Sequence, residues 1–407
     1  MINGNGAQYM KEWMDLEGPL SIKGIDDRYV RENTAILMQN QKTKDLGKAL
    51  FETHTINVGA PAAMNVGFPE SGNYGSFAPI ALALVRRVFP HLFANTLVGV
   101  QAMTGPVGLA YALRFVYADG TNNEAAWNNI PEYSGYTGST AGTSSSALDS
   151  GTGVATSAAE AWKLKADAGD MPELQLKLDR TAIIAMTRKL AASFSLEAAQ
   201  DIKAMHGLDI EREMLNVLQY EMAAEMDRET IQKCKDAAPA RVTWDVGSSA
   251  ADGRWSQEKF TNITTQIIKA ANDLATANRR GAGNIVVVSG RLATALQASG
   301  PIFTRNQSNV NPTQVMPEIG TINGTIKVYR DQYATEDEAL VAYKGPGVTD
   351  AGVIFCPYVT GLTNRSIAQD DFSPRIGVMS RYAFTNNLLG SQNYYRRILF
   401  SNLDQLI

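Results

Sequence analysis

The stretch GVQAMTGPVGLAYALRFVY, residues 99–117, decides how the first half of the chain is organised. Gly105 and Gly108 lie on either side of Pro106, and a large residue follows at every second position. These large residues are Leu109, Tyr111, Leu113, Phe115 and Tyr117. A period of two is that of a β-strand, because successive side chains point to opposite faces. A phosphate-binding loop needs consecutive backbone N–H donors, and Pro106 has no N–H, so the turn is predicted to start a strand.

A second alternating run, LQLKLDR at residues 174–180, matches the first. Between the two runs, residues 134–158 are dominated by Gly, Ser and Thr, and Asp149 is their single charged residue. A structureless loop of this length is unusual inside one compact domain. We therefore predict that residues 107–182 form a projecting hairpin or an inserted flap, with the two runs as its arms.

Residues 210–237 predict one long helix that acts as a strut. Asp209 is placed to cap its start, and the helix before it is predicted to end at Gly207. Apolar residues recur at every fourth position: Ile210, Met214, Leu218, Met222 and Met226. The opposite face carries Glu211, Glu221, Glu225 and Arg228. At 1.5 Å per residue the helix would extend about 40 Å.

From residue 254 the pattern changes to a succession of helices and buried strands. A helix is predicted over 258–279, a wholly apolar strand over 285–288 and a second helix over 290–297, with further strands behind them. This succession indicates a separate α/β unit. The tail contains a Tyr-rich strand pattern, NYYRRILF at 393–400, which we expect to return to the first unit.

Composition excludes several classes of protein. The chain is 44% hydrophobic and 19% charged, which is ordinary for a globular protein, and its formal net charge of −4 gives no field that attracts nucleic acid or an anionic membrane. Cys234 and Cys356 lack the spacing of a zinc site and are expected to be buried reduced thiols. The N-terminus has no apolar core of signal-peptide length, and no stretch approaches the roughly 20 apolar residues of a membrane span. We therefore expect a protein made and kept in a cytoplasm.

No group of residues predicts catalysis, a cofactor or a metal site. The histidines are far apart in sequence: His54, His91 and His206. Asp370 and Asp371 lie in the turn AQDDFSP, where solvated acids are the usual case. VVVSGRLATAL, residues 286–296, has the strand–turn–helix order of a nucleotide site but only one glycine. One alternative is a cytoplasmic α/β enzyme whose site lies at the ends of strand 285–288.

Three segments together resemble the major capsid proteins of T-even-type, contractile-tailed bacteriophages. They are VRRVFPHLFANTLVGVQAMTGPVGLAYALRFVYADG (85–120), FSLEAAQDIKAMHGLDIEREMLNVLQYEMAAEMDRETI (194–231) and NYYRRILF (393–400). TAILMQNQ (34–41) looks like the family's pre-cleavage region. The resemblance implies an α+β chain with the tailed-phage capsid fold, also called the Hong Kong ninety-seven fold.

The resemblance also implies a division of the chain. Residues 1–52, which could form short helices but not a core of their own, would be an N-terminal extension, and 53–79 an N-terminal arm. The other parts would be an extended loop (107–182), a peripheral domain (80–106 and 183–253, with spine helix 210–237), an axial domain (254–355) and a return to the peripheral domain (356–407).

The function that this resemblance implies is structural. Many copies would assemble, mainly as hexamers, into an icosahedral head shell that encloses double-stranded phage DNA without specific binding. The chain would need no cofactor and no membrane, and it would be assembled in the host bacterial cytoplasm and kept in the virion. Partners would be a scaffold, a prohead protease, and vertex, portal and decoration proteins. An encapsulin-like compartment is a second alternative.

Two sets of residues are candidates for specific roles in assembly. Leu50, Phe51 and Glu52 match the Leu/Ile-x-Glu pattern that prohead proteases of the family cut after, so Thr53 would become the new N-terminus. The other set comprises candidate subunit contacts: Glu221, Glu225 and Arg228 on the long helix, and Tyr136 and Ser145 in the Gly/Ser/Thr tract. That tract lacks core-forming residues, so a neighbouring subunit is expected to order it.

Overall fold

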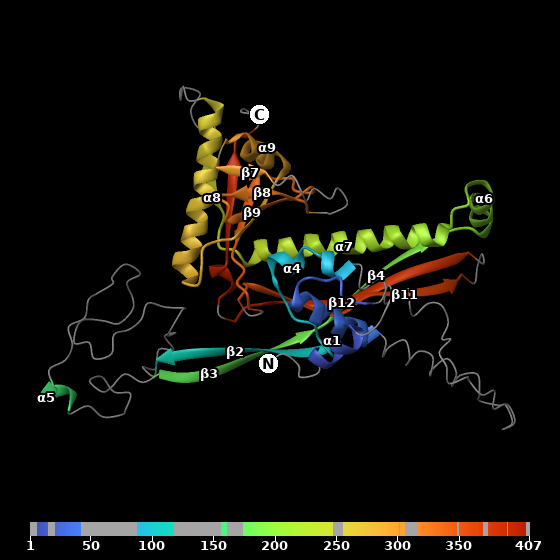
Figure 1. Ribbon diagram of the computed structural model, residues 1–407, viewed down its shortest axis with the longest axis horizontal. Helices are drawn as coiled ribbons and strands as arrows, with labels where there is room; N and C mark the ends of the chain where they lie inside the picture. Colours follow the sequence, from blue (N-terminus) through green and yellow to red (C-terminus); the bar gives the residue numbers. More distant parts are fainter. Residues whose placement is uncertain are drawn as a thin grey trace.

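The computed structural model describes residues 6–14, 21–41, 88–117, 156–160, 174–246, 255–300, 302–305, 316–347, 350–368, 373–388 and 390–403. These residues form a seven-stranded sheet, a four-stranded sheet and a two-stranded ribbon, with helices packed on both larger sheets (Figure 1). The predicted α+β class is confirmed.

The ribbon is the predicted hairpin. Strand β2 (Val107–Tyr117) pairs antiparallel with β3 (Leu174–Ile184) from Val107 opposite Ile184 to Tyr117 opposite Leu174. Figure 1 shows the two strands extending away from the rest of the molecule. Gly108 lies close to Met103 at the base of the ribbon: a Cβ there would be 2.9 Å from the Met103 sulfur, so that side chain would have to shift. Beyond the arms, only the short helix α5 (Thr156–Ala159) is described.

The four-stranded sheet has the order β1 (Gly99–Val100), β11 (Val353–Ile367), β12 (Pro374–Asn386) and β4 (Met186–Ser193). Strands β1 and β11 are parallel, and the other two pairs are antiparallel. Before the sheet come the single-turn helices η1 (Phe89–His91) and α4 (Ala94–Leu97). Helix α7 lies along one face of the sheet (Figure 1).

Helix α7 (Ile210–Ala237) has the predicted bounds because both signals for its start are local. The Asp209 carboxylate accepts a hydrogen bond from the Glu211 N–H, and helix α6 (Leu196–His206) before it ends at Gly207, where φ is +67°. The predicted apolar stripe is buried from Leu218 onward, whereas Ile210 and Met214 are half-buried.

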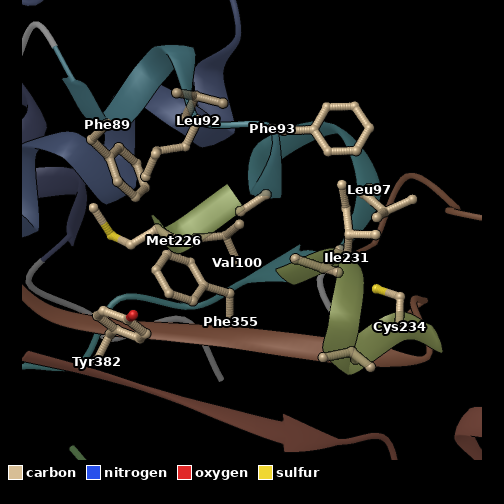
Figure 2. Packing of buried hydrophobic residues seen from close by; sticks show 14 of the residues in the cluster. Phe89, Leu92, Phe93, Leu97, Val100, Met226, Ile231, Cys234, Phe355 and Tyr382 are labelled. Carbon is tan, nitrogen blue, oxygen red and sulfur yellow. The ribbon is translucent and has the colours of Figure 1, made fainter. Parts of the chain in front are cut away.

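Buried residues on α7 join two parts of the core. Leu218 and Met222 pack with Ile376 and Val378 of the four-stranded sheet. Further along, α7 enters the main core, whose residues in Figure 2 include Met226, Ile231, Cys234, Phe89 and Phe355. Asp227 is also buried; it accepts a hydrogen bond from the Phe93 N–H at 2.9 Å, and burial raises the pKa of its carboxyl to about 7.

The seven-stranded sheet contains the predicted strand 285–288 and two strands from outside the range 254–355, whereas β11, which begins within that range at Val353, lies in the four-stranded sheet instead. The order of the seven-stranded sheet is β5 (Val242–Asp245), β13 (Tyr395–Ser401), β10 (Glu338–Ala342), β6 (Ile285–Val288), β9 (Ile326–Arg330), β8 (Glu318–Ile322) and β7 (Phe303–Arg305). Helices α8 (Ser256–Asn278) and α9 (Gly290–Ala298) pack on it and enclose a second core with Val286 and Val288.

The last strand of the chain, β13, does not join the four-stranded sheet, although the tail was predicted to return to the part of the molecule formed by residues before 254. Residues 356–386 do so through β11 and β12, but β13 lies between β5 and β10 in the seven-stranded sheet, after the single turn η3 (Ser391–Asn393). The expectation that all of 356–407 joins the peripheral domain is therefore wrong for β13. Strand β5 also lies in the seven-stranded sheet, although the range 183–253 that contains it was expected in the peripheral domain. An alternating pattern identifies a strand and its buried face, but it does not identify the strand's partners.

The N-terminal segment packs into the main core. Helix α1 (Gly6–Met14) and a helix over residues 28–41 are present, as expected for short helices without a core of their own. Ala35, Ile36, Leu37 and Met38 are at most 4% exposed and belong to the same cluster as Phe89 and Phe355. The N-terminal segment therefore shares the main core, which lies against the four-stranded sheet.

Candidate subunit-contact surfaces

One face of the β2–β3 ribbon is apolar and exposed. Directly opposite residues of two paired strands share a face, so alternate positions of β2 and their partners on β3 form one surface. The exposed large apolar members of this surface, between 39% and 63% accessible, are Val107, Leu109, Tyr111, Phe115, Leu176, Leu178 and Ile184. Arg180, opposite Tyr111, is an exposed charged residue on the same face. On the other face Ala110 and Ile183 are buried at the base of the ribbon. A face with this many exposed large apolar side chains is a candidate interaction site.

The charged side of α7 borders a groove of about 1040 Å³ between α7, β4 and the turn before β10. Glu221 and Glu225 line it together with Arg228, whose guanidinium lies 5.0 Å from the centre of the Tyr333 ring. All three helix residues predicted as subunit contacts are thus brought to one surface. Glu211, predicted on the same face, instead forms an ion pair with Arg365 near the start of the helix.

Arg188 on β4 gives this surface an internal partner that the sequence did not indicate. Its guanidinium contacts Glu225 at 2.6 Å and Glu229 at 2.7 Å. Glu225 is therefore paired within its own chain, while its side chain stays 47% exposed. Because Arg188 and Glu225 are 37 residues apart, no local spacing could have revealed the pair.

A buried ion cluster joins α7 to the seven-stranded sheet. Glu338 on β10 contacts Arg397 of β13 at 2.5 Å and Lys235 of α7 at 3.1 Å, and its side chain is only 4% exposed. Burial alone would raise the pKa of this carboxyl. The hydrogen bond from Arg397 and the nearby charge of Lys235 outweigh burial, so the pKa of Glu338 is lowered.

No candidate catalytic site forms among the described residues. Ser289, at the end of β6 where an enzyme site was considered, caps α9 through the Leu292 N–H and donates to Asp337 at 3.1 Å. His206 is exposed at the end of α6. Groups of three or more metal-binding side chains are also missing within the described ranges.

Both cysteines are free and buried, as expected, and burial raises the pKa of the Cys234 and Cys356 thiols to about 12. The remaining predicted residues lie outside the described part of the chain: Leu50, Glu52, Thr53, Tyr136, Ser145, His54, Asp370 and Asp371.

Comparison with known proteins identifies the family of the chain. The model of the family described as "Major capsid protein Gp23" matches residues 74–400. The chain belongs to the Gp23 family of major capsid proteins. The major capsid protein of Salmonella phage ViI is 30% identical over 389 residues, which cover 88% of this chain and 85% of the relative. That of Enterobacteria phage T4 is 27% identical over 398 residues, covering 78% and 76%.

Solved structures similar to this Gp23-family chain include two phage capsids. The capsid of Myoviridae phage XM1 has a TM-score of 0.41 at 9% identity and covers 76% of this chain and 92% of that one. The mature capsid of bacteriophage PhiM1 has a TM-score of 0.40 at 13% identity and covers 74% and 84%.

Family membership confirms the resemblance and the structural function. The Gp23-family chain is a shell-forming protein of the phage capsid in the virion, and it is not an enzyme. The alternatives, an α/β enzyme and an encapsulin-like compartment, are not favoured. Within the described ranges, every helix is too short or too polar to cross a membrane.

Proposed function

We propose that the Gp23-family chain forms the icosahedral head shell chiefly as hexamers, enclosing double-stranded DNA without specific binding. The observation that carries this proposal is the apolar face of the projecting β2–β3 ribbon. A two-stranded ribbon is at best marginally stable alone in water, so an exposed apolar face on it favours packing against a neighbouring subunit. A net charge of −4 gives the shell no strong attraction for the enclosed DNA.

The proposed division of the chain follows the sheets. We assign residues 107–182 to the extended loop, the four-stranded sheet with α7 to the peripheral domain, and the seven-stranded sheet, including β5 and β13, to the axial domain. Residues 53–79 remain the proposed N-terminal arm. Identical subunits that repeat one contact around a closed ring need complementary surfaces at different places on the chain, and the apolar face of the ribbon and the α7 groove are formed by different strands and helices.

A substitution on the apolar face of the ribbon tests the proposal. Leu178→Ser is expected to change the free energy of unfolding by no more than about 0.5 kcal/mol, because Leu178 is 62% exposed. It is expected to reduce the number of complete shells severalfold, counted by negative-stain microscopy. The matched control is Lys177→Ser, one position along on the opposite face. Normal shell numbers for Leu178→Ser would contradict the role of this face.

The charged groove on α7 is the second proposed contact: Glu221, Glu225 and Arg228 would face a neighbouring subunit. Tyr136 and Ser145, in the Gly/Ser/Thr tract, are also proposed to contact a neighbouring subunit. Glu221→Lys is expected to melt as the unmodified protein, since exposed ion pairs contribute about 0–1 kcal/mol. Repeated at every contact, the same change is expected to narrow the salt range over which shells form. Asp201→Lys, exposed on α6, is the control. If Glu221→Lys formed shells at every salt concentration tested, the assignment of α7 to a contact between subunits would be wrong.

Maturation is the third part of the proposal. We infer that a prohead protease cuts after Glu52 while the shell is built around a scaffold, and that vertex, portal and decoration proteins complete the head. The basis is the triplet Leu50-Phe51-Glu52, which is followed by a Gly/Ala-rich segment. Mass spectrometry of protein from mature particles is expected to find Thr53 at the N-terminus. An intact Met1 terminus in finished virions would reject the cut.

A further inference from the structure

The single-turn helix α4 lies between the two large sheets and contacts both. Shortly after Leu97 the chain enters β1 of the four-stranded sheet, and Leu97 packs in the main core with Ile231 of α7 (Figure 2). On the other side, the Phe93 ring packs edge-on against the Tyr329 ring on β9 of the seven-stranded sheet, with ring centres 5.1 Å apart. A change in the position of one sheet relative to the other therefore changes the contacts of α4.

A buried carboxylate on α7 binds the start of α4. Asp227 is 4% exposed and accepts hydrogen bonds from the backbone N–H groups of Phe93, at 2.9 Å, and of Ala94. Among the described residues, no Lys, Arg or His forms an ion pair with this carboxylate. Burial disfavours the charged form, and two N–H groups replace only part of its hydration. Burial therefore raises the pKa of Asp227 to about 7, although both hydrogen bonds lower it.

A lysine of the seven-stranded sheet binds the same helix. Lys344 lies just after β10, and the Asn284 side chain fixes its backbone by accepting from the Lys344 N–H at 3.0 Å and donating to the Lys344 carbonyl at 2.7 Å. The Lys344 ammonium donates to the Asn95 carbonyl within α4. Asp27, an exposed carboxylate of the N-terminal segment, raises the pKa of Lys344. Burial has the larger effect, and it lowers the pKa of Lys344 to about 8.

The side chain of Asn95 leaves this contact incompletely satisfied. Its NH2 group donates to the Phe89 carbonyl at 2.6 Å, but its buried oxygen accepts no hydrogen bond from the described residues. An unsatisfied buried acceptor raises the energy of the arrangement that contains it, as do the two charges that burial disfavours. Entry of water at α4 would satisfy all three groups.

The elements packed against α4 bring other titratable residues near it. The segment that contains α4 includes His91. From β9, Tyr329 donates its hydroxyl to Glu318 at 3.3 Å, and burial raises the pKa of Tyr329. The residues one turn from Asp227 on α7 are all uncharged: Ala223, Ala224, Thr230 and Ile231. The carboxylate and the ammonium described above are therefore the charged groups whose bonds to the backbone hold α4.

We propose that α4 is a pH-sensitive joint between the two sheets, held closed by the hydrogen bonds of Asp227 and Lys344. Opening of the joint gives both groups water, so their charged forms favour opening and their neutral forms favour closure. An open joint lets one sheet turn relative to the other while each keeps its own core. The joint belongs to the single subunit, and it depends neither on hexamers nor on the cut after Glu52.

The two groups give the opening a defined dependence on pH. Because the pKa of Asp227 is raised in the closed joint, opening releases a proton, and the opening constant is expected to rise about tenfold per pH unit between 3.8 and about 7. Because the pKa of Lys344 is lowered in the closed joint, opening takes up a proton. The opening constant is therefore expected to fall about tenfold per pH unit between about 8 and 10.5. The joint opens most readily between about pH 7 and pH 8.

Hydrogen exchange of the full chain measures the opening. The Leu97 and Val98 N–H groups bond within the turn to the Phe93 and Ala94 carbonyls, at 3.1 Å each, so exchange in a peptide covering 93–98 reports whether α4 is open. Exchange is followed by mass spectrometry at several pH values and corrected for the intrinsic pH dependence of amide exchange. From pH 5 to pH 7 the opening constant is expected to rise about 100-fold, and from pH 8 to pH 9 to fall about tenfold.

Two neutral variants separate the contributions of the two groups. Asp227→Asn has no proton to release, so it is expected to abolish the rise below pH 7 and to keep the fall above pH 8. Lys344→Met has no proton to take up, so it is expected to abolish the fall and to keep the rise. The matched controls are Asp236→Asn on α7 and Lys327→Met on β9, both at exposed positions, and they should leave both changes in place.

Three results would overturn the proposal. An opening constant that does not vary with pH in the unmodified protein would show that the two charges do not control α4. Rise and fall that both persist in Asp227→Asn and in Lys344→Met would assign them to other groups. The same profile in the buried strand β6 would show that the whole subunit unfolds and that α4 is not a joint. If Asp227→Asn fails to fold, the unmodified protein and Lys344→Met decide the question.

Discussion

Phe355→Ala is expected to lower the free energy of unfolding by about 3–5 kcal/mol, the cost of emptying a large buried aromatic site. Phe355 is fully buried on β11, and its ring centre lies 5.4 Å from that of Tyr382 and 5.0 Å from that of Phe384. The side chain also belongs to the cluster that holds α7 and the N-terminal helix (Figure 2). Urea denaturation followed by circular dichroism measures the loss.

The matched control is Phe115→Ala on the exposed face of the ribbon. Phe115 is 39% exposed, so its removal is expected to cost the free subunit no more than about 1 kcal/mol. Both variants are expected to give few shells, but for different reasons: Phe355→Ala loses the folded subunit, and Phe115→Ala loses a contact between subunits. Equal denaturation midpoints for the two variants would contradict the assignment of Phe355 to the core.

Local patterns were sufficient to predict the elements that carry their own signals. The start of α7 follows from Asp209 and the end of α6 from Gly207, each of which is adjacent to the helix end that it fixes. The arms of the ribbon follow from alternation within β2 and β3, and their pairing follows from having a single long segment between them. Each of these signals depends on residues close together in the sequence.

Pairing between distant segments could not be predicted. Strand β13 has buried residues at Tyr395, Ile398 and Phe400 with half-buried residues between them, a pattern that does not name the partner strands. Only the three-dimensional arrangement places it beside β10 and β5. The same limit applies to Arg188 and Glu225 in the candidate contact surface, and to Asn33, which bonds to Val100 67 residues later. Composition marked residues 1–52 as unable to form a core alone, but it did not show which core residues 28–41 would join.

The Glu338 cluster fixes the seven-stranded sheet to the end of α7, and its disruption is the second large effect. Glu338→Gln removes the negative charge between two cations and is expected to cost about 3–5 kcal/mol, because Arg397 and Lys235 would keep their charges without a buried partner. Chemical denaturation at neutral pH measures this. Glu336→Gln is the control: it lies two residues earlier, is 57% exposed and pairs with Arg241 at 2.9 Å, so about 0–1 kcal/mol is expected.

The effect of Glu338→Gln is also expected to depend on pH, with a sign fixed by the lowered pKa. Burial opposes the charged form, but the Arg397 hydrogen bond and the Lys235 charge outweigh it, so the folded state holds this carboxylate charged below the usual pKa of 4.5. A group with a lowered pKa in the folded state contributes stability above its unfolded pKa and loses that contribution as the pH falls through its folded pKa. The difference in unfolding free energy between the unmodified protein and Glu338→Gln should therefore be constant at neutral pH. It should shrink as the pH falls below 4.5, because protonated glutamate and glutamine are both neutral. A difference that stayed the same at acid pH would mean that packing of the side chain, and not its charge, holds α7 against the sheet.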